Sequence, residues 1–413
     1  MIESMKVDVA VIGSGPAGLA AAIELKKQGI ARVVVIERET EAGGIPRHCN
    51  HYPYGVLEYK SLMKGPEFAK RNVAHATKLG VEILTRATVT KLLPQGVLEV
   101  MTPDGAFNID ASRVLIATGV RETPRSARLI GGDRPIGVIN TGALQSYIHL
   151  KGKKPFKRPV IVGTELVSLS AIATCLEAKI KPVAMIDSQA RATVRQPFML
   201  YPKMCNVPVL YNAQLISING RPRVESVTIQ DADGREREIK CDGVILTGQF
   251  VPDTALLRTS HLVLDNGSGG PQIDQCGRCS DPSYFAAGNL LRAVETAGWS
   301  YREGRAIGKI IANDLIGKSA NGDSYQIAVA APFKYCVPQR LSLSAQGALT
   351  SLQLRVNQPV KGQLEVVCGS EVIYTRTICS RPERRILIPI DKVLGHNNAQ
   401  GTLQIRIAGH DRS

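Results

Sequence analysis

The chain has 413 residues, of which 44% are hydrophobic and 21% are charged, and its formal net charge is +15 at neutral pH. This composition is that of a globular protein and excludes a disordered or fibrous chain, and the length allows two or three domains of ordinary size. No uninterrupted apolar run reaches the length of about 18 residues that a membrane-spanning helix needs, so no membrane span is expected.

The positive charge would attract anions such as nucleic acid, phospholipid head groups or an acidic partner subunit. The basic residues are dispersed, however, with only short clusters at 151–158 and 381–385, and we find no nucleic-acid fold signature. We therefore expect no nucleic-acid partner. The nine cysteines are scattered, and the first residues lack the pattern of a secretory signal, which together favour a reduced, cytoplasmic protein.

Residues 6–39 have the pattern of a βαβ dinucleotide-binding unit. An apolar strand at 7–12 leads into a turn, a helix with a small-residue face follows over 17–27, and the strand RVVVIE ends at Glu37. Three glycines form G-x-G-x-x-G in the turn, at Gly13, Gly15 and Gly18. They allow a tight turn, close approach of a pyrophosphate to the backbone, and close helix–strand packing. The carboxylate of Glu37 would accept hydrogen bonds from a ribose.

Two later segments narrow the choice of nucleotide. In SRVLIATGV a strand enters the turn 117–119, and in YFAAGNLL a strand enters the turn 286–289 before a long helix. With the first unit, these segments resemble FAD-dependent oxidoreductases with two dinucleotide domains, the pyridine nucleotide-disulfide reductase group, over residues 6 to about 317. The resemblance implies that Asn289 holds a ribityl hydroxyl, a role usually given to Asp, and that the start of the long helix approaches the isoalloxazine. The residues that it assigns to FAD are Gly13, Gly15, Pro16, Ala17, Gly18, Glu37, Arg38, Gly44, Val89, Ala117, Thr118, Gly119, Gly288, Asn289, Ala297 and Gly298.

A second βαβ unit repeats the frame of the first. Gly163 to Asp187 and Gly13 to Glu37 both span 24 residues (187 − 163 and 37 − 13), but Glu165 and Ser168 stand where the second and third glycines belong. A carboxylate at the second glycine position adds bulk and like-charge repulsion where a pyrophosphate would bind. The sequence therefore favours a unit that keeps its fold and loses NAD(P), although Asp187 could still accept a ribose.

The predicted fold class is α/β, with two Rossmann-like three-layer dinucleotide-binding domains, the second inserted in the first, and a C-terminal all-β domain. After a Gly/Ser/Asn linker, short runs of alternating hydrophobicity such as QLEVVCG and GTLQIRIA indicate a β-sandwich-like domain without a catalytic constellation. The predicted boundaries are 1–122 and 247–320 for the two parts of the FAD domain, 123–246 for the second domain, and 331–413 for the β domain.

Neither usual disulfide relay of the group is present. No C-x-x-C precedes the second glycine turn, and only one cysteine, Cys49, follows the Gly-Gly at 43–44. The one C-x-x-C, Cys276 to Cys279, lies where the resemblance places a structural turn, and we interpret it as an incidental pair. We expect no metal site, because zinc would need a second pair and the C-terminal cysteines are too isolated for an iron–sulfur centre.

The segment GVINTGALQ (137–145) is similar to flavoprotein subunits of amine and imino-acid dehydrogenases, of the opine oxidase, hydrogen cyanide synthase, hydroxyproline dehydrogenase and sarcosine oxidase types. It also resembles flavoproteins that accompany glycerol-3-phosphate dehydrogenase. This resemblance implies a small-molecule substrate and either a partner subunit or a homo-oligomer.

The segment RHCNHYPYG (47–55) is the best candidate for catalysis, because the resemblance places it past the flavin ring. His48 or His51 could take a proton from a substrate whose carbon gives up hydride, and Cys49 could be a nucleophile if nearby positive charge lowers its pKa. Tyr52 or Tyr54 could orient a substrate, and Arg47 could pair with a carboxylate or phosphate. The alternative is a polar loop that only covers the flavin.

The sequence therefore predicts an FAD-dependent oxidoreductase. It would oxidise a small amine, imino acid or hydroxy or polyol substrate, or relay electrons within a dehydrogenase complex. Two alternatives remain open: an NAD(P)H-dependent acceptor reductase that uses the second domain, and a non-catalytic subunit that carries flavin as a scaffold.

Overall fold

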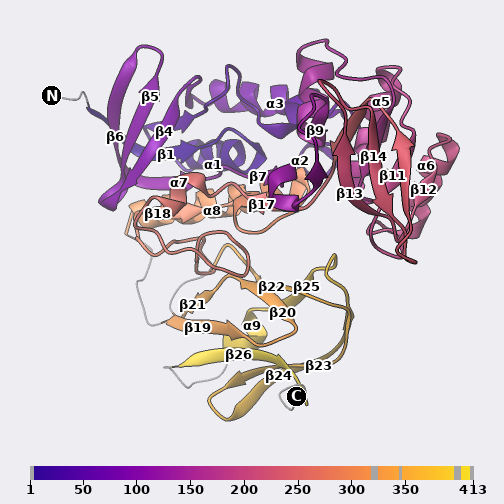
Figure 1. Cartoon of the computed structure of the whole chain (residues 1–413). Coiled ribbons are helices and arrows are strands. Elements are labelled where there is room, and N and C mark those ends of the chain that lie inside the picture. Colours follow the sequence, from indigo (N-terminus) through magenta and orange to yellow (C-terminus); the bar gives the residue numbers. More distant parts are fainter. Residues whose placement is uncertain (1–3, 318–323, 344–346, 395–400, 410–413) are drawn as a thin grey trace.

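The computed structural model describes residues 4–317, 324–343, 347–394 and 401–409. Three units pack on one another in this part of the chain, as Figure 1 shows. The first is an α/β unit at the upper left of the view, the second is another α/β unit at the right, and the third is a β unit below them. The arrangement agrees with the predicted fold class of two α/β domains and a C-terminal β domain.

The first unit is built on a mixed sheet with strand order β3-β2-β1-β6-β5-β4, and β18 also pairs with β6. The strands β3, β2, β1, β6 and β18 run parallel, and β4 and β5 add antiparallel pairs at one end. The central parallel strands are nearly continuous apolar runs, because both of their faces are covered. The bounds are β1 Ser4–Ile12, β2 Val33–Ile36, β3 Glu82–Leu84, β4 Thr88–Leu93, β5 Val97–Thr102, β6 Gly105–Ile116 and β18 Tyr284–Ala286.

Two long helices of this unit lie unusually close together. The small-residue face of α1 packs on α8, where a Cβ at Gly304 would overlap the carbonyl oxygen of Ala17 and a Cβ at Gly308 would be 2.8 Å from the carbonyl oxygen of Ala21. The small residues of α1 are therefore explained by this helix pair as well as by the turn that precedes them. The helices of the unit are α1 Pro16–Lys27, η1 Ile45–His48, α2 Val56–Tyr59, α3 Gly65–Lys78, η2 Pro94–Gly96, α7 Ala255–Arg258, η6 Gly288–Leu290 and α8 Ala297–Leu315.

We expect Gly304→Val to lower the free energy of unfolding by about 1–3 kcal/mol, because the backbone of α1 cannot move away without disturbing the sheet beneath it. Denaturant unfolding would measure this change. Lys309→Val is the matched control, since Lys309 is an exposed position on the same helix. A loss in Gly304→Val no larger than that in Lys309→Val would contradict the packing argument, because helix propensity alone favours valine over glycine.

The second unit has a parallel sheet of order β12-β11-β10-β16-β9 and a smaller sheet of order β15-β14-β13-β8. The chain enters and leaves the unit through β7 and β17, which pair antiparallel. The boundaries at 122 and 246 stay predictions. The strands are β7 Val120–Glu122, β8 Gly131–Gly132, β9 Val138–Asn140, β10 Pro159–Val162, β11 Ala184–Ile186, β12 Val209–Leu210, β13 Gln214–Asn219, β14 Ser226–Gln230, β15 Glu236–Lys240, β16 Gly243–Leu246 and β17 Phe250–Pro252. The helices are η3 Arg125–Arg128, α4 Thr141–Gln145, η4 Ser146–Leu150, α5 Leu166–Glu177, η5 Gln196–Met199 and α6 Leu200–Met204.

The C-terminal unit consists of two sheets, of order β21-β19-β26-β23-β24 and β20-β22-β25. Its first strand begins at Ser324, before the predicted boundary near residue 331, because the strand SYQIAV follows directly on the polar stretch that we interpreted as a linker. The bounds are β19 Ser324–Val329, β20 Phe333–Val337, β21 Arg340–Ser342, β22 Ser351–Val356, β23 Val360–Cys368, β24 Glu371–Ser380, β25 Ile386–Pro389, α9 Asp391–Leu394 and β26 Thr402–Ile407.

The C-terminal unit shares part of its core with the first unit. Tyr335 and Val337 of β20 belong to the same buried apolar cluster as Ile273 and Leu290 of the first unit. The backbone of Ile273 also exchanges hydrogen bonds with Gln339, which precedes β21. The β unit is therefore packed on the first unit rather than tethered to it.

Candidate functional site

The first glycine turn forms an open cradle at the N-terminus of α1. Gly13 has a φ of 100°, Gly15 is the N-cap, Pro16 occupies the first turn, and none of the described side chains caps the helix. A Cβ at Gly15 would have no described atom within 4 Å, whereas a Cβ at Gly18 would overlap the Gly13 carbonyl oxygen. The free N–H groups of the first turn therefore have room beside them, as a bound pyrophosphate requires.

Glu37 is held in place at the end of β2. Its carboxylate accepts hydrogen bonds from the Ser14 hydroxyl, from the backbone N–H of Ser14 at 3.1 Å and from that of Glu39 at 2.9 Å. The Ser14 oxygen in turn accepts the N–H of Gly43 at 2.9 Å. This fixes a carboxylate beside the cradle, where a ribose would lie. Arg38 is exposed, and its Nη1 atom is 3.5 Å from Asp253.

The other small-residue turns assigned to FAD meet at this cradle. The turn 117–119 follows β6 and the turn 288–289 follows β18, and β1, β6 and β18 are parallel neighbours, so their carboxyl ends lie at one edge of the sheet. Gly44 adjoins Gly15, since a Cβ at Gly44 would be 2.7 Å from the Gly15 Cα. The start of β4 joins them, because Ala87, two residues before Val89, donates its N–H to the Glu37 carbonyl oxygen at 3.0 Å.

Two residues assigned to the flavin end have neighbours that sequence reasoning did not identify. The Asn289 side chain accepts the N–H of Glu295 at 2.6 Å and donates to its carbonyl oxygen at 3.1 Å, so it holds the loop before α8. Gly298, next to Ala297 in the first turn of α8, lies against the carboxylate of Glu58, whose Oε1 atom is buried without a hydrogen-bond partner among the described residues. The role of Asn289 toward a ribityl hydroxyl stays a prediction.

The second glycine turn repeats the hydrogen bonds of the first, displaced by 150 residues. Thr164 stands at the place of Ser14 and Asp187 at the place of Glu37, and the Thr164 hydroxyl donates to the Asp187 carboxylate. The backbone N–H of Gln189 donates to Asp187 at 2.9 Å, and that of Thr193 donates to Thr164 at 3.0 Å. The predicted internal repeat is therefore present in the hydrogen bonds as well as in the spacing.

In the second unit, the space that corresponds to the open cradle is filled by the side chain of Glu165. A Cβ at Gly163 or at Gly248 would overlap the Glu165 carboxylate, whereas at Gly119, the place that corresponds to Gly248, it would meet no described atom within 4 Å. The Ser168 and Thr247 hydroxyls each donate to Glu165 Oε2 at 3.1 Å. Burial raises the pKa of the Glu165 carboxyl above its ordinary value, and these hydrogen bonds oppose the rise. The acidic group thus lies in the space where the first unit is open.

The segment 47–55 packs against the second unit. Cys49 lies just after η1 and is buried, its Sγ atom is 3.4 Å from the Gln145 amide oxygen, and Tyr54 hydrogen-bonds to it. Burial raises the pKa of the Cys49 thiol to about 11, so the group is a protonated thiol near neutral pH. The condition that we set for a nucleophilic Cys49, a pKa lowered by positive charge, is not met in this arrangement.

His48 has one ring nitrogen without a hydrogen-bond partner among the described residues. Its Nε2 atom is buried and accepts no hydrogen bond from the described residues. Burial, together with the charge of Arg47 and the proximity of His149, lowers the pKa of His48 to about 4. His51 differs, since its Nδ1 atom lies 3.0 Å from the Tyr52 carbonyl oxygen on the exposed side of the loop. His48 is therefore the better placed of the two to accept a proton.

Several residues at this contact were missed by sequence reasoning. The His149 Nε2 atom is buried and also lacks a hydrogen-bond partner among the described residues, and it is 3.9 Å from Glu177, which accepts a 2.6 Å hydrogen bond from Asn50. Gln145 and His149 lie four residues apart on the continuous helix of α4 and η4. A polar pair at helical spacing in a segment already compared with amine dehydrogenases was the available signal.

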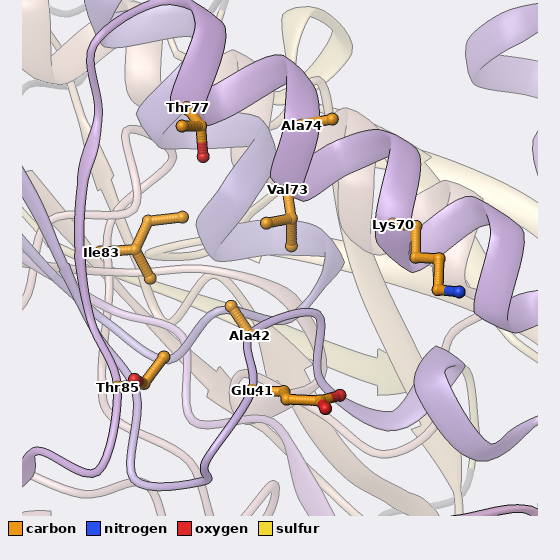
Figure 2. Close-up of a pocket in the computed structure, with 8 residues that line it drawn as sticks. All are labelled: Glu41, Ala42, Lys70, Val73, Ala74, Thr77, Ile83 and Thr85. Atoms are coloured by element: carbon orange, nitrogen blue, oxygen red, sulfur yellow. The ribbon is translucent and has the colours of Figure 1, made fainter.

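Figure 2 shows a pocket in the first unit. It has a volume of about 450 Å³ and lies between α3, the end of β3 and the loop after Glu37. Residues that line it are Glu41, Ala42, Lys70, Val73, Ala74, Thr77, Ile83 and Thr85. None of them belongs to the residues assigned to FAD or to catalysis.

Cys276 and Cys279 are both buried, and burial raises the pKa of the Cys276 thiol to about 12. All nine cysteines are free, and no cluster of metal-ligating side chains occurs within the described ranges. Within the same residues, no helix is long and apolar enough to cross a membrane.

Known proteins resemble this chain in sequence and fold. A model of the pyridine nucleotide-disulphide oxidoreductase family matches residues 7–304. An opine oxidase subunit of Agrobacterium tumefaciens (strain Ach5) is 26% identical over 310 residues, which cover 68% of this chain and 61% of the relative. The alpha subunit of sarcosine oxidase from Rhizobium meliloti (strain 1021) is 25% identical over 310 residues, 70% of this chain and 28% of the relative. The chain spans about three fifths of the length of the opine oxidase subunits that it matches.

Solved structures agree with the fold. Thioredoxin reductase of T. acidophilum superposes with a TM-score of 0.63 at 25% identity, covering 75% of this chain and 99% of that one. L-proline dehydrogenase of P. horikoshii superposes with a TM-score of 0.58 at 20% identity, a likeness of fold, over 78% of this chain and 58% of that one. With an open glycine cradle, a carboxylate fixed beside it and a family match over most of its length, the chain belongs to the pyridine nucleotide-disulphide oxidoreductase family, which uses FAD.

Proposed function

We propose that this protein oxidises a small substrate that carries an amine, imine or hydroxyl group next to a carboxylate, with FAD in the first cradle and without NAD(P)H. The observation that carries the proposal is the contrast between the two cradles: the first is open beside Gly15, and the second is filled by Glu165. Bound FAD would supply an acceptor for a hydride equivalent from the substrate carbon. The electrons then come from a substrate rather than from a nicotinamide.

The charge around the segment 47–55 supports a substrate with an anionic group. Burial is the main cause of the lowered pKa of His48 and His149. The charge of Arg47, which also pairs with Glu41 at 3.2 Å, adds to it at His48, and Lys64 and His51 add to it at His149, where Glu177 opposes it. These cationic groups give a positive contribution to the field at both rings. A carboxylate would be attracted to such a field, whereas a plain amine that is charged in solution would be repelled. This favours amino, imino or hydroxy acids over simple amines and polyols.

His48 is proposed as the base for this oxidation. Its Nε2 atom has no hydrogen-bond partner among the described residues, and its lowered pKa keeps the ring unprotonated through the neutral range. In the tautomer with the proton on Nδ1, Nε2 is available to accept a proton from the substrate as it is oxidised, although the low pKa makes it a weak base. Cys49, a buried thiol that is hydrogen-bonded to Tyr54 and Gln145, would hold the loop in position.

A partner subunit is also proposed. Two of the relatives are named as subunits. The segment 45–62 carries exposed large apolar side chains, at Ile45, Tyr52, Val56, Leu57 and Leu62. Apolar side chains that gather on one surface are typical of a protein interface, and the chain's charge of +15 favours an acidic partner.

An anaerobic titration tests the proposed function. The flavin absorbance would be followed while NADH, NADPH and matched pairs such as proline and pyrrolidine, or sarcosine and dimethylamine, are added in turn. We expect bleaching by a carboxylate-bearing member and little by its decarboxylated partner. Bleaching by micromolar NADH would instead establish the acceptor-reductase alternative, and bleaching by none of a broad panel would favour the scaffold subunit.

With an active substrate in hand, His48→Gln is expected to lower kcat by about 100-fold or more, as loss of a general base does. Because the pKa of His48 is lowered to about 4, its base form persists as the pH falls, and kcat/KM of the natural protein should stay level from about pH 8 to about pH 5.5. Steady-state kinetics over this range would measure both effects.

His75→Gln is the control for this experiment, because His75 lies in the last turn of α3, where the charged neighbours that affect its pKa, Lys27, Lys78 and Arg71, all belong to the first unit. FAD content should be the same in both variants. A normal kcat in His48→Gln, or an acid limb near pH 6.5 in the natural protein, would remove His48 as the base.

A further inference from the structure

The C-terminal β unit contacts the flavin side of the first unit through a buried arginine. Arg292, in the loop between β18 and α8, is only 3% exposed, and its Nη2 atom is 2.6 Å from Glu303 Oε2 on α8. Its Nε atom donates to the side-chain oxygen of Gln353 at 2.7 Å, and Gln353 is a buried residue of β22 in the C-terminal unit. A guanidinium that is buried away from water depends on such partners, and the β unit supplies one of its hydrogen-bond acceptors while Glu303 supplies the opposite charge.

Glu303 connects Arg292 to the turn 288–289, which is assigned to FAD. Its second oxygen, Oε1, accepts the backbone N–H of Gly288 at 2.7 Å. Gly288 has a φ of 77° and packs against Ala17 of the cradle helix. A continuous chain of hydrogen bonds therefore runs from Gln353 through Arg292 and Glu303 to a residue assigned to FAD.

A second contact reaches the start of α8. Arg385, just before β25 in the β unit, places its Nη1 atom 2.8 Å from Glu295 Oε2 and its guanidinium 4.6 Å from the centre of the Trp299 ring. The backbone of Glu295 holds both ends of the Asn289 side chain. Trp299 adjoins Gly298 in the first turn of the helix. Both contacts thus converge on the segment 288–299, which contains Asn289, Ala297 and Gly298.

We propose that the C-terminal β unit is a positioning domain for the flavin, in which Gln353 and Arg385 hold the segment 288–299 in the conformation that FAD requires. The proposal rests on FAD lying in the first cradle, as under the proposed function. Arg292, Gln353 and Arg385 are positioning residues, since they act through Glu303, Glu295 and the loop. Cofactor affinity and flavin environment, rather than the fold alone, should therefore depend on this interface.

The test uses the full chain with Gln353→Leu and Arg385→Met, each of which removes one contact. We expect the dissociation constant of FAD to rise at least tenfold in each variant, and the midpoint potential of the flavin that remains bound to shift. Trp299 is the single tryptophan of the chain, so its fluorescence reports on the Arg385 contact directly. Arg385→Lys, which keeps a cation over the ring and beside Glu295, should restore most of the FAD affinity.

Arg376→Met is the matched control, because Arg376 is an exposed arginine of β24 in the same unit. It should leave FAD affinity, potential and tryptophan emission unchanged. Circular dichroism and thermal unfolding would identify a variant that fails to fold, in which case the other variant carries the test. If both variants fold and retain FAD with unchanged affinity and potential, the positioning proposal is overturned while the proposed function stands. If the natural protein takes up no FAD at all, the proposed function fails first.

Discussion

Replacement of Glu165 and Ser168 together by glycine is expected to create a nucleotide site in the second unit. The Thr164–Asp187 pair that would receive a ribose is already formed, so the main obstacles are the carboxylate in the cradle and the side chain at the third glycine position. Two unit charges about 4 Å apart repel by about 4 kcal/mol at an effective dielectric constant of about 20. Recovery of about half of that energy would tighten binding of NADH about 30-fold.

Equilibrium binding of NADH, followed by its fluorescence, would measure this gain, and anaerobic bleaching of the flavin would show whether the bound nucleotide can also deliver its hydride. Glu165→Gln separates charge from bulk, because it removes the charge and keeps the side chain in the cradle. Leu166→Gly is the control, since it places a glycine at an exposed position of the same helix start and keeps Glu165. Tight NADH binding by the natural protein would refute the interpretation of a filled cradle.

The βαβ units could be predicted because their signals are local. The glycine turn and the terminal carboxylate of the first unit are 24 residues apart (37 − 13), the apolar strand directly precedes the turn, and the second unit repeats that frame. What Glu165 does within the frame could not be predicted. Its position over Gly163 depends on Thr247, which is 82 residues away in the chain and reaches it only because β16 pairs with β10.

The candidate catalytic residues show the same limit. The sequence singled out the segment 47–55 by its density of reactive side chains, but His149 comes close to His48 only when the second unit folds against the first. The sign of the pKa shift at Cys49 was equally inaccessible, because it follows from burial beneath Gln145 and Tyr54 and not from the basic residues nearby in the sequence. The composition of a segment can identify it as a reactive loop. Burial in the folded protein decides which of the side chains in that loop are charged.

The β unit shows a third limit of prediction from the sequence, which concerns how the units pack on one another. Its strands were recognised from period-two alternation, yet no sequence signal indicated that it faces the flavin side of the first unit. That contact is made by single residues, Gln353 and Arg385, whose partners are Arg292 and Glu295. In the sequence these are ordinary polar residues of a solvated strand or loop, and only the packing of the two units makes them buried.

The reciprocal change, Gly15→Glu, is expected to convert the first cradle into a copy of the second and to abolish FAD binding. Gly15 has an ordinary extended backbone and space around it, so the new side chain should be accepted without strain in the fold. Thr118 stands at the place of Thr247, but its hydroxyl donates to the Asp253 carbonyl oxygen at 2.9 Å, so the new carboxylate would have to compete for it. Like-charge repulsion of about 4 kcal/mol, with the added bulk, should weaken FAD binding by at least about 100-fold, so that the protein is purified colourless.

Gly15→Ala is the comparison variant, because it adds one Cβ to the open space beside the cradle but no charge, so it should cost much less FAD affinity than Gly15→Glu. Flavin absorbance per chain, compared with thermal unfolding of the apoprotein, would separate loss of cofactor from loss of fold. If Gly15→Glu held FAD as tightly as Gly15→Ala, a carboxylate at this position would be compatible with a dinucleotide. The same result would remove the reason for excluding NAD(P)H from the second unit, since the two cradles share one frame and differ chiefly in the side chains at their second and third glycine positions.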